Sequence, residues 1–207
     1  IKAEFKTDRN NLYKHLVHAI NFGQGASGAQ EKIYLETGIV FDVKLIQKLM
    51  DLYNQELFPS IPKWHKEVRL QADRDGYLRN AFSYCHRFSH VFSWRKVGGR
   101  WEQGLGDEAE AVLAFKPQSN AAGIMKESLL RLFFNRYEEA GQYLRLTVHD
   151  EIFCQVPIGM EEKVDAVLLE EMERPVPELA LLESYNMGAA LSILTESKVG
   201  TSWGQMR

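Results

Sequence analysis

The sequence predicts an α+β fold, in which helices and antiparallel strands follow one another without regular alternation. Several segments repeat apolar residues with a helical period, whereas residues 143–156 alternate apolar and polar side chains as the strands of a hairpin do. Strands do not alternate with helices along the chain, which disfavours a parallel α/β sheet. With 207 residues, 45% of them hydrophobic, the chain has enough apolar side chains for a packed core.

The first 75 residues are predicted to be mainly helical. The candidate helices cover residues 8–22, 30–37, 42–57 and 63–73. Asp8 is a candidate cap for the first helix, and Gly38 is a candidate stop for the second. Pro59 and Pro62 interrupt the helical pattern before the last of the four.

The rest of the chain is predicted to mix strands with helices. Its candidate elements are a strand-like, turn-rich region over residues 76–106, a helix over 107–139, the hairpin over 143–156, an acidic helix over 160–174 and a strand over 187–194. In the hairpin, His149, Asp150 and Glu151 separate the two alternating runs. These three residues are therefore expected at the hairpin tip.

The composition excludes several classes of protein. A formal net charge of -3 excludes a histone-like basic protein, although a local basic cleft remains open. Cys85 and Cys154 alone cannot form a disulfide framework or a cysteine-based zinc site. The chain has no apolar run of about 18 residues, so we expect no transmembrane helix. Its first six residues also lack the apolar segment of a signal peptide.

The glycines Gly23-x-Gly25-x-x-Gly28, with Asp42 farther along, match the dinucleotide-binding pattern. That pattern requires a strand before the first glycine. The preceding segment has a helical period instead, so we interpret the glycines as the end of a helix followed by a turn.

Two other signals are weak. Cys85 and His86, with His90 nearby, lack a second pair of metal ligands, and we interpret them as surface or base-stacking residues. No G-x-S-x-G nucleophile elbow supports a Ser-His-Asp hydrolase.

Two consecutive carboxylates, Asp150 and Glu151, occupy the predicted hairpin tip. They repel each other unless a positive group lies near them, and a divalent cation is the natural partner. Mg²⁺ suits such a site, because it takes few protein carboxylates and leaves its other positions to water and substrate phosphates. A plain polar turn remains the alternative, since Asp is common in turns.

Lys14, His18 and Phe22 are four residues apart and therefore lie on one face of the first helix. A cation followed by two rings suits a nucleoside triphosphate, with Lys14 at a phosphate and Phe22 near the base. An ordinary surface helix with a core-facing Phe22 fits the same spacing.

These segments together resemble the family A DNA polymerases, the bacterial DNA polymerase I type. Lys14-x-x-x-His18-x-x-x-Phe22-Gly23 is similar to motif B, which lies on the fingers helix, expected here over residues 9–23. Val148-His149-Asp150-Glu151 is similar to motif C, the palm hairpin. Some phage members resemble this chain further, with His in the place of His18 and a Gly-x-Gly continuation.

Two more motifs follow in the family's order. Residues 117–126 resemble the palm helix, which carries a glutamine at the position of Gln118. Gly200-Thr201-Ser202-Trp203 matches the closing Gly-x-x-Trp of the family. The four motifs in order are more specific than any one of them alone.

The resemblance implies template-directed addition of a dNTP to a primer 3′ end, with release of pyrophosphate and with two Mg²⁺ ions bound. The implied site residues are Asp150 and Glu151 for catalysis, with Asp150 as a metal ligand; Lys14, His18, Phe22 and Arg9 for the nucleotide; and His149 and Gln118 for DNA. Two departures from motif B stand out. Its leading Arg falls at Asn10, one place after Arg9, and Phe22 stands where Tyr is usual.

A basic stretch with interleaved aromatic residues follows Gly76. Its cations are Arg79, Arg87, Arg95, Lys96 and Arg100. The pattern suits contact with a nucleic-acid backbone, and we assign Arg79 and Arg87 to DNA binding. An ordinary basic surface loop is the alternative.

The resemblance covers only part of a polymerase. Motif A, which carries the second metal-binding Asp, should precede motif B, yet residues 1–8 do not resemble it. Thumb and exonuclease-like regions are missing as well. The resemblance therefore implies fingers helices over residues 1–75 and the C-terminal half of the palm, with its antiparallel sheet, over residues 76–207.

We expect a piece of a longer chain, or one subunit of a split enzyme, that does not polymerise alone. Its expected partners are primer-template DNA, dNTP and an upstream segment or second subunit that carries the motif A Asp, with no membrane. Its expected location is the cytoplasm, of the host if a phage encodes it. The alternatives are a catalytically silent DNA-binding module derived from such a polymerase and, from the glycines, a nucleotide-binding oxidoreductase.

Overall fold

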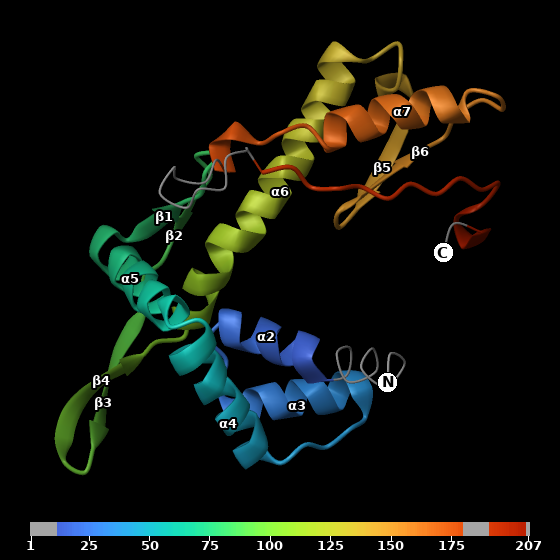
Figure 1. Ribbon diagram of the computed structural model, residues 1–207. Coiled ribbons are helices and arrows are strands. Elements are labelled where there is room, and N and C mark those ends of the chain that lie inside the picture. Colours follow the sequence, from blue (N-terminus) through green and yellow to red (C-terminus); the bar gives the residue numbers. More distant parts are fainter. Residues whose placement is uncertain (1–11, 180–190, 206–207) are drawn as a thin grey trace. The chain divides into compact units, whose positions relative to one another are not determined.

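The computed structural model describes residues 12–179 and 191–205 (Figure 1). Packing divides the chain into two compact units, Ile1–Pro117 (unit 1) and Gln118–Arg207 (unit 2). Both units combine helices with antiparallel strand pairs, which confirms the predicted α+β class. The division follows packing alone, so the fingers assignment of residues 1–75 and the palm assignment of residues 76–207 remain predictions.

Unit 1 begins with a succession of helices. They are α2 (Lys14–Asn21), α3 (Ala26–Thr37), α4 (Val43–Leu52), the π-helical turn η2 (Tyr53–Leu57) and α5 (Ser60–Asp75). The Asp42 carboxylate caps α4 by accepting a hydrogen bond from the Lys44 N–H at 2.9 Å. Gly38 ends α3 as predicted, with φ at 72°. Pro62 lies in the first turn of α5, where its missing N–H removes no helical hydrogen bond.

Two hydrophobic clusters hold unit 1 together. In the first, α2, α3 and α4 share a core in which Ile20, Ile33 and Ile46 are at most 2% exposed. The second joins Val68 of α5 to Leu78 and to other apolar residues up to the start of α6. Because Ile20 faces the first core, the opposite face of α2 is left to solvent.

The predicted turn-rich region forms two hairpins. β1 (Tyr77–Arg79) pairs antiparallel with β2 (Cys85–Arg87), and β3 (Phe92–Val97) pairs antiparallel with β4 (Arg100–Leu105). In the first hairpin Leu78 points into the core, while its neighbours Tyr77 and Arg79 are exposed. The second hairpin extends away from α5, with its turn at the free end (Figure 1).

The long helix α6 (Ala109–Asn135) contains Pro117, at which the two units are divided. Proline inside a helix removes a hydrogen bond and crowds the preceding turn, yet α6 continues through Pro117 without a break. Neither α6 nor any other helix within residues 12–179 and 191–205 is long and apolar enough to cross a bilayer.

Unit 2 packs the predicted hairpin against helices. β5 (Leu144–Val148) pairs antiparallel with β6 (Glu151–Cys154), and α7 (Glu161–Met172) follows, which confirms both predicted elements. The core joins Leu132 of α6, Val164 and Val167 of α7, and Ile152 of β6. One face of the hairpin is thereby held by two helices.

A buried carboxylate fastens α7 to α6 in unit 2. Glu171 is 3% exposed and makes ion pairs with Arg131 at 3.1 Å, Arg136 at 3.2 Å and Arg174 at 3.3 Å. The Arg131 Nη2 also donates to the Glu171 carbonyl oxygen at 2.8 Å. A buried charge with this many donors is satisfied, and removing the Glu171 carboxylate would leave Arg131 without its ion-pair partner within the described residues.

The strand predicted over residues 187–194 is wrong for the part that the structure describes. Residues 187–190 lie outside the described residues, Leu191 makes a single bridge to Val176, and residues 192–194 are not a strand. The Ser192 hydroxyl and the Thr195 N–H donate to Glu173 instead. Strands of the described chain pair only two at a time, so a wider palm sheet remains a prediction.

Candidate functional site

The predicted nucleotide-binding residues lie on the solvent face of α2. Lys14 and His18 are exposed, and Phe22, at the C-cap of the helix, is half-buried. The centroids of the His18 and Phe22 rings are 4.5 Å apart, with 53° between the ring planes. The spacing therefore brings the two rings together as predicted. Arg9 and the candidate cap Asp8 lie outside the described residues.

The imidazole of His18 favours its neutral form. Partial desolvation, and after it the positive charge of Lys32, lower the pKa of His18 below its usual value. Glu36 opposes this shift, although its carboxylate also pairs with His15 Nδ1 at 2.7 Å. A neutral ring beside Phe22 can stack on a base without the desolvation penalty of a cation.

A Schellman motif ends α2, and its geometry requires a glycine. The Gly23 N–H donates to the Ile20 carbonyl and the Gln24 N–H to the Ala19 carbonyl, both at 2.9 Å. Gly23 has φ at +77°, and a Cβ there would lie 2.7 Å from Leu113 Cδ1. Glycine at this position both turns the chain and admits the side chain from α6.

The glycine pattern does not form a dinucleotide-binding turn. A helix, not a strand, precedes Gly23, and Gly25 is the N-cap of α3. Gly28 lies inside α3. The interpretation as a helix end followed by a turn is confirmed, and α3 begins at Ala26 rather than at residue 30 because Gly25 already ends the break.

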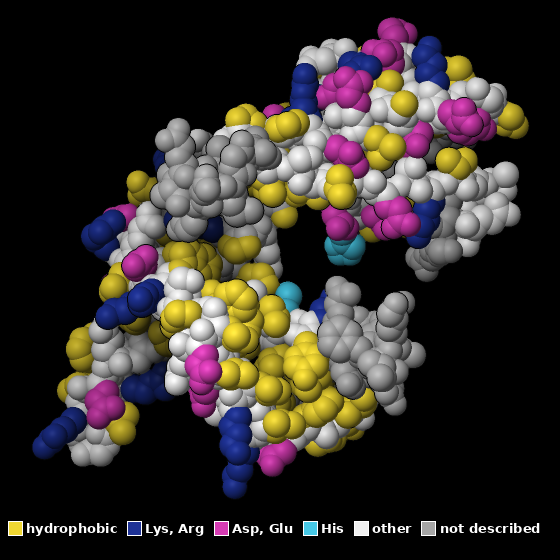
Figure 2. Space-filling model, in the orientation of Figure 1, with side chains coloured by type: hydrophobic (Ala, Val, Ile, Leu, Met, Phe, Trp, Pro, Cys, Tyr) yellow, Lys and Arg dark blue, Asp and Glu magenta, His cyan; other side chains and the backbone are white. Residues whose placement is uncertain are grey.

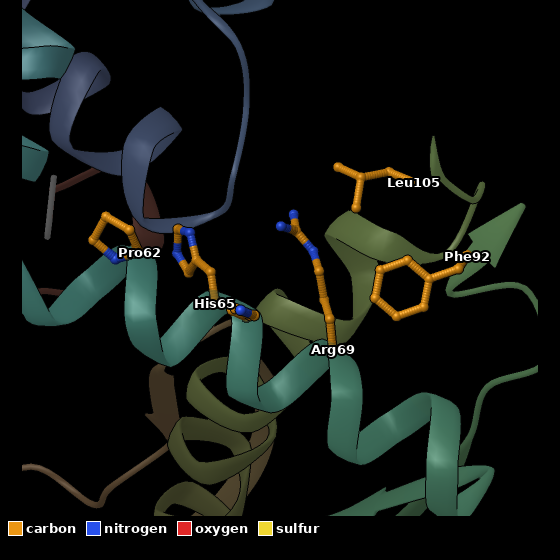
Figure 3. A pocket seen from close by; sticks show the side chains of 6 residues that line it. Pro62, His65, Arg69, Phe92 and Leu105 are labelled. Atoms are coloured by element: carbon orange, nitrogen blue, oxygen red, sulfur yellow. The ribbon is translucent and has the colours of Figure 1, made fainter. Parts of the chain in front are cut away.

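A pocket in unit 1, which the sequence did not predict, lies beside the end of α2. Its cavity measures about 270 Å³ and is lined by Pro62, His65, Lys66, Arg69, Phe92 and Leu105 (Figure 3). His65 Nε2 lies 3.0 Å from the Asn21 carbonyl oxygen, and Arg69 Nε donates to the Ala109 carbonyl at 3.1 Å. The two side chains thus hold the end of α2 and the start of α6 against α5.

Burial beside this pocket changes the pKa of both His65 and Arg69. Burial lowers the pKa of His65, against the opposing effect of its bond to Asn21. Burial also lowers the pKa of Arg69, whose guanidinium nevertheless stays charged. The Arg69 Nη2 is buried without a hydrogen-bond partner among the described residues. His65 and Arg69 could have been found from the sequence as a pair of basic residues one helical turn apart, on a helix whose Val68 faces the core.

The predicted catalytic carboxylates lie at the tip of the β5–β6 hairpin. Val148 pairs with Glu151, which leaves His149 and Asp150 as a two-residue turn. His149 has φ at +55°, a left-handed conformation that is uncommon for a residue with a side chain. His149, Asp150 and Glu151 are all exposed.

This tip fits a magnesium ion. The carboxylates of Asp150 and Glu151 face solvent, and no ion pair within the described chain neutralises either of them. Carboxylate oxygens are the donors that Mg²⁺ prefers, and one or two of them suffice when phosphates and water complete its shell. Among the described residues no group of three or more His, Cys, Asp or Glu could hold a metal.

The closing Gly-x-x-Trp motif supports the same hairpin. The Trp203 ring lies 4.3 Å, between centroids, from the ring of Phe153 on β6. Phe153 is two residues after Glu151, so the aromatic contact braces the strand that begins with the second carboxylate.

The predicted DNA-binding arginines share one exposed face of the β1–β2 hairpin. Arg87 is opposite Tyr77 and Arg79 is opposite Cys85 in the register, which places the two arginines on the same side. Arg79 also lies over the Tyr77 ring, 5.4 Å from its centroid. Gln118 is exposed on α6, at the start of unit 2.

Comparison with protein families matches residues 2–205 to "DNA polymerase family A". Among curated proteins, the thermostable DNA polymerase I of Thermus aquaticus is 28% identical over 174 residues, which cover 83% of this chain and 20% of that protein. The DNA polymerase of Mycobacterium phage D29 is 25% identical over 190 residues, which cover 90% of this chain and 25% of that protein. The chain thus spans about a fifth to a quarter of the length of these relatives.

A solved structure has a related fold. It is the POL domain of Pol1 from M. smegmatis, in complex with DNA primer-template and dNTP. The TM-score is 0.59 at 21% sequence identity, and the match covers 77% of this chain and 26% of the other.

Proposed function

This chain belongs to DNA polymerase family A, and we propose that it supplies the fingers and the second half of the palm of a polymerase that adds dNTPs to a primer 3′ end. The observation that carries the proposal is the pair of exposed carboxylates at the β5–β6 tip, which no cationic side chain of the described residues pairs, within a chain that matches the family over residues 2–205. A hairpin that holds two negative charges together without a partner favours a cation-binding role over a plain turn.

Asp150 would hold Mg²⁺ through its carboxylate, with Glu151 as the neighbouring carboxylate. When bound, the metal ions would neutralise charge on the attacking and leaving oxygens of an in-line phosphoryl displacement. His149, whose left-handed backbone places it in the turn beside Asp150, would contact the primer terminus.

The solvent face of α2 would bind the incoming nucleotide. Lys14 would pair with phosphate oxygens, where an ammonium group acts as a point charge. The ring pair of His18 and Phe22 would contact the base, because two rings 4.5 Å apart offer an apolar surface at the helix end. Arg9 would extend the nucleotide-binding set.

The remaining predicted residues would bind the DNA. The Gln118 amide can donate to the minor-groove acceptors that all base pairs share, so it would read pairing geometry rather than sequence. Arg79 and Arg87, on one face of β1–β2, would contact phosphates. An intracellular location would follow from a DNA substrate.

Apolar side chains on α6 support the dependence on another segment. Leu130, Phe133 and Phe134 lie at helical spacing and are 47–72% exposed. An apolar stripe of this kind is normally covered. We propose that the segment carrying the motif A Asp, from the same or another chain, covers it and completes the metal site.

Primer extension with Mg²⁺ and the four dNTPs tests the proposal, first on the 207-residue chain and then with a motif A segment supplied. Extension is expected only in the second case. Asp150→Ala is expected to reduce it by roughly 10²- to 10³-fold, the scale of losing one preorganised charge-stabilising group. Glu162→Gln, an exposed change on α7, is the matched control and leaves extension intact.

Two outcomes would redirect the proposal. Extension that survives Asp150→Ala would remove the carboxylate from the mechanism. Tight binding of primer-template without extension, even with motif A supplied, would favour the catalytically silent DNA-binding module.

A further inference from the structure

Two tryptophans on the β3–β4 hairpin face solvent. Trp94 is 65% exposed and Trp101 is 67% exposed. Tryptophan is among the residues that gain most from burial, and an exposed pair on one element marks a contact surface.

The strand register places both rings on one face of the hairpin. Trp94 is opposite Gln103, and Trp101 is opposite Lys96, so the tryptophans are diagonal neighbours. Directly opposed residues and alternate residues share a face, which therefore consists of Phe92, Trp94, Lys96, Trp101, Gln103 and Leu105. We call this surface the tryptophan face.

The tryptophan face continues into the pocket of unit 1. Phe92 and Leu105, at the base of the hairpin, line the cavity together with His65, Lys66 and Arg69 of α5. Figure 3 shows the Arg69 side chain rising from α5 between His65 and Phe92. Aromatic rings thus lead from the hairpin to a group of basic side chains.

The charge of the hairpin is also positive. It carries Arg95, Lys96 and Arg100 against a single acid, Glu102, and Lys and Arg side chains gather towards its projecting end (Figure 2). Arg95 folds back over Gly104 and donates to the Leu105 carbonyl at 3.1 Å. Lys96 is the cation of the tryptophan face, and it makes no ion pair within the described chain, which leaves it for an anionic ligand.

We propose that the tryptophan face binds single-stranded DNA, with bases stacked on Trp94 and Trp101 and the backbone near Lys96. Base stacking on aromatic side chains beside a basic groove is how proteins hold single strands without sequence preference. Diagonal neighbours across an antiparallel strand pair are about 7–8 Å apart, roughly twice the 3.4 Å spacing of stacked bases in a duplex. The two tryptophan rings therefore suit an extended, unpaired strand. The choice of DNA rests on the proposed function.

Fluorescence anisotropy with a labelled oligothymidylate of about 16 nucleotides tests this on the full 207-residue chain. Trp94→Leu and Trp101→Leu keep an apolar side chain on the hairpin and remove the stacking surface. Each is expected to weaken binding by about fivefold or more, while Trp94→Phe retains a ring and most of the affinity. Circular dichroism confirms that the leucine variants keep the native fold.

The charges and the strandedness of the ligand give independent readouts. Lys96→Gln is expected to reduce the slope of log affinity against log salt by about 0.7, the value for one lost phosphate contact. A blunt duplex of the same length is expected to compete poorly. The proposal would be overturned if both tryptophan-to-leucine variants bound the oligothymidylate as tightly as the unchanged chain does. It would also be overturned if the duplex competed as well as the single strand.

The test is separable from that of polymerase activity. Asp150→Ala is expected to leave oligothymidylate binding unchanged, because the site lies on the β3–β4 hairpin. Extension without oligothymidylate binding would refute the tryptophan face alone. Binding that depends on the tryptophans, without extension under any condition, would refute the polymerase proposal alone.

Discussion

Two hairpins of this chain have turns of the same length but opposite composition. In β3–β4 the turn residues are Gly98 and Gly99, with φ at +56° and +84°. Positive φ at both positions is the requirement of a type I′ turn, and glycine meets it without strain. In β5–β6 the turn residues are His149 and Asp150, and His149 adopts a φ of +55° with a full side chain.

The glycines of the β3–β4 turn meet a backbone requirement, whereas the residues of the β5–β6 turn bring polar side chains to the hairpin tip. A type II′ turn also has a positive φ at its first central position, where glycine is usual. His149 is therefore held against its backbone preference, at a cost of about 1–2 kcal/mol. Such strain persists where the side chain is needed, and it is found beside the two exposed carboxylates.

The largest effect is expected at Gly23, where left-handed φ and close contact coincide. Gly23→Ala adds backbone strain and a Cβ that would lie 2.7 Å from Leu113 Cδ1. We expect the free energy of unfolding to fall by about 2–4 kcal/mol, the sum of strain and overpacking. Urea denaturation followed by circular dichroism measures it.

Gly28→Ala is the matched control for Gly23. Gly28 lies inside α3, with no atom within 4 Å of an added Cβ, so alanine should raise the free energy of unfolding by about 0.5–1 kcal/mol. A loss of stability at Gly28 equal to that at Gly23 would show that the glycine pattern acts as a unit after all.

Gly99→Ala should have the next largest effect, confined to β3–β4. The left-handed φ penalises alanine by about 1–2 kcal/mol, and no neighbour lies within 4 Å to add overlap. Hydrogen exchange of the β3 and β4 amides should accelerate, while that of α2 and α3 stays unchanged. Unchanged protection in β3–β4 would mean that the turn does not need glycine.

His149→Gly should act in the opposite direction on stability. Relief of the left-handed strain, less the added freedom of glycine in the unfolded chain, should stabilise the β5–β6 hairpin by about 0.5–1 kcal/mol. Primer extension by the complemented chain should fall at the same time, because the imidazole is lost. A variant that is both less stable and fully active would reverse the distinction between the two hairpins.

The smallest effect is expected from pH, through His65 beside the end of α2. Burial lowers the pKa of His65 in the folded chain, so the unfolded chain binds its proton more readily. The free energy of unfolding should therefore decline as the pH falls from about 7.5 to about 5.5, through the unfolded pKa of about 6.5. His65→Gln should flatten this part of the profile, and urea midpoints at several pH values measure it. An unchanged profile would place the titrating group elsewhere.

The sequence predicted those features that depend on neighbours along the chain. The periodicity of residues 42–57 located α4, and alternation located the β5–β6 hairpin within a residue or two. The four-residue spacing of His18 and Phe22 predicted their contact. Each of these follows from helix or strand geometry alone.

Features that depend on distant segments escaped prediction. The pocket at Arg69 needs α5, β3 and β4 to meet, and the Phe153–Trp203 contact joins residues 50 apart in the sequence. The predicted strand over residues 187–194 had suitable residues, but side-chain bonds to Glu173 fix the described part of that segment instead. The local sequence pattern does not show whether a segment pairs as a strand or is held by hydrogen bonds to a distant residue.

The apolar stripe of α6 also has a consequence for the self-association of this chain in solution. Leu130, Phe133 and Phe134 present an apolar ridge to water, and two such ridges can cover each other as readily as a missing segment covers one. Elution volume in size-exclusion chromatography should therefore depend on the amount loaded. A supplied motif A segment that covers the ridge would act as a solubiliser as well as a catalytic complement, and light scattering would report its docking before any nucleotide is added.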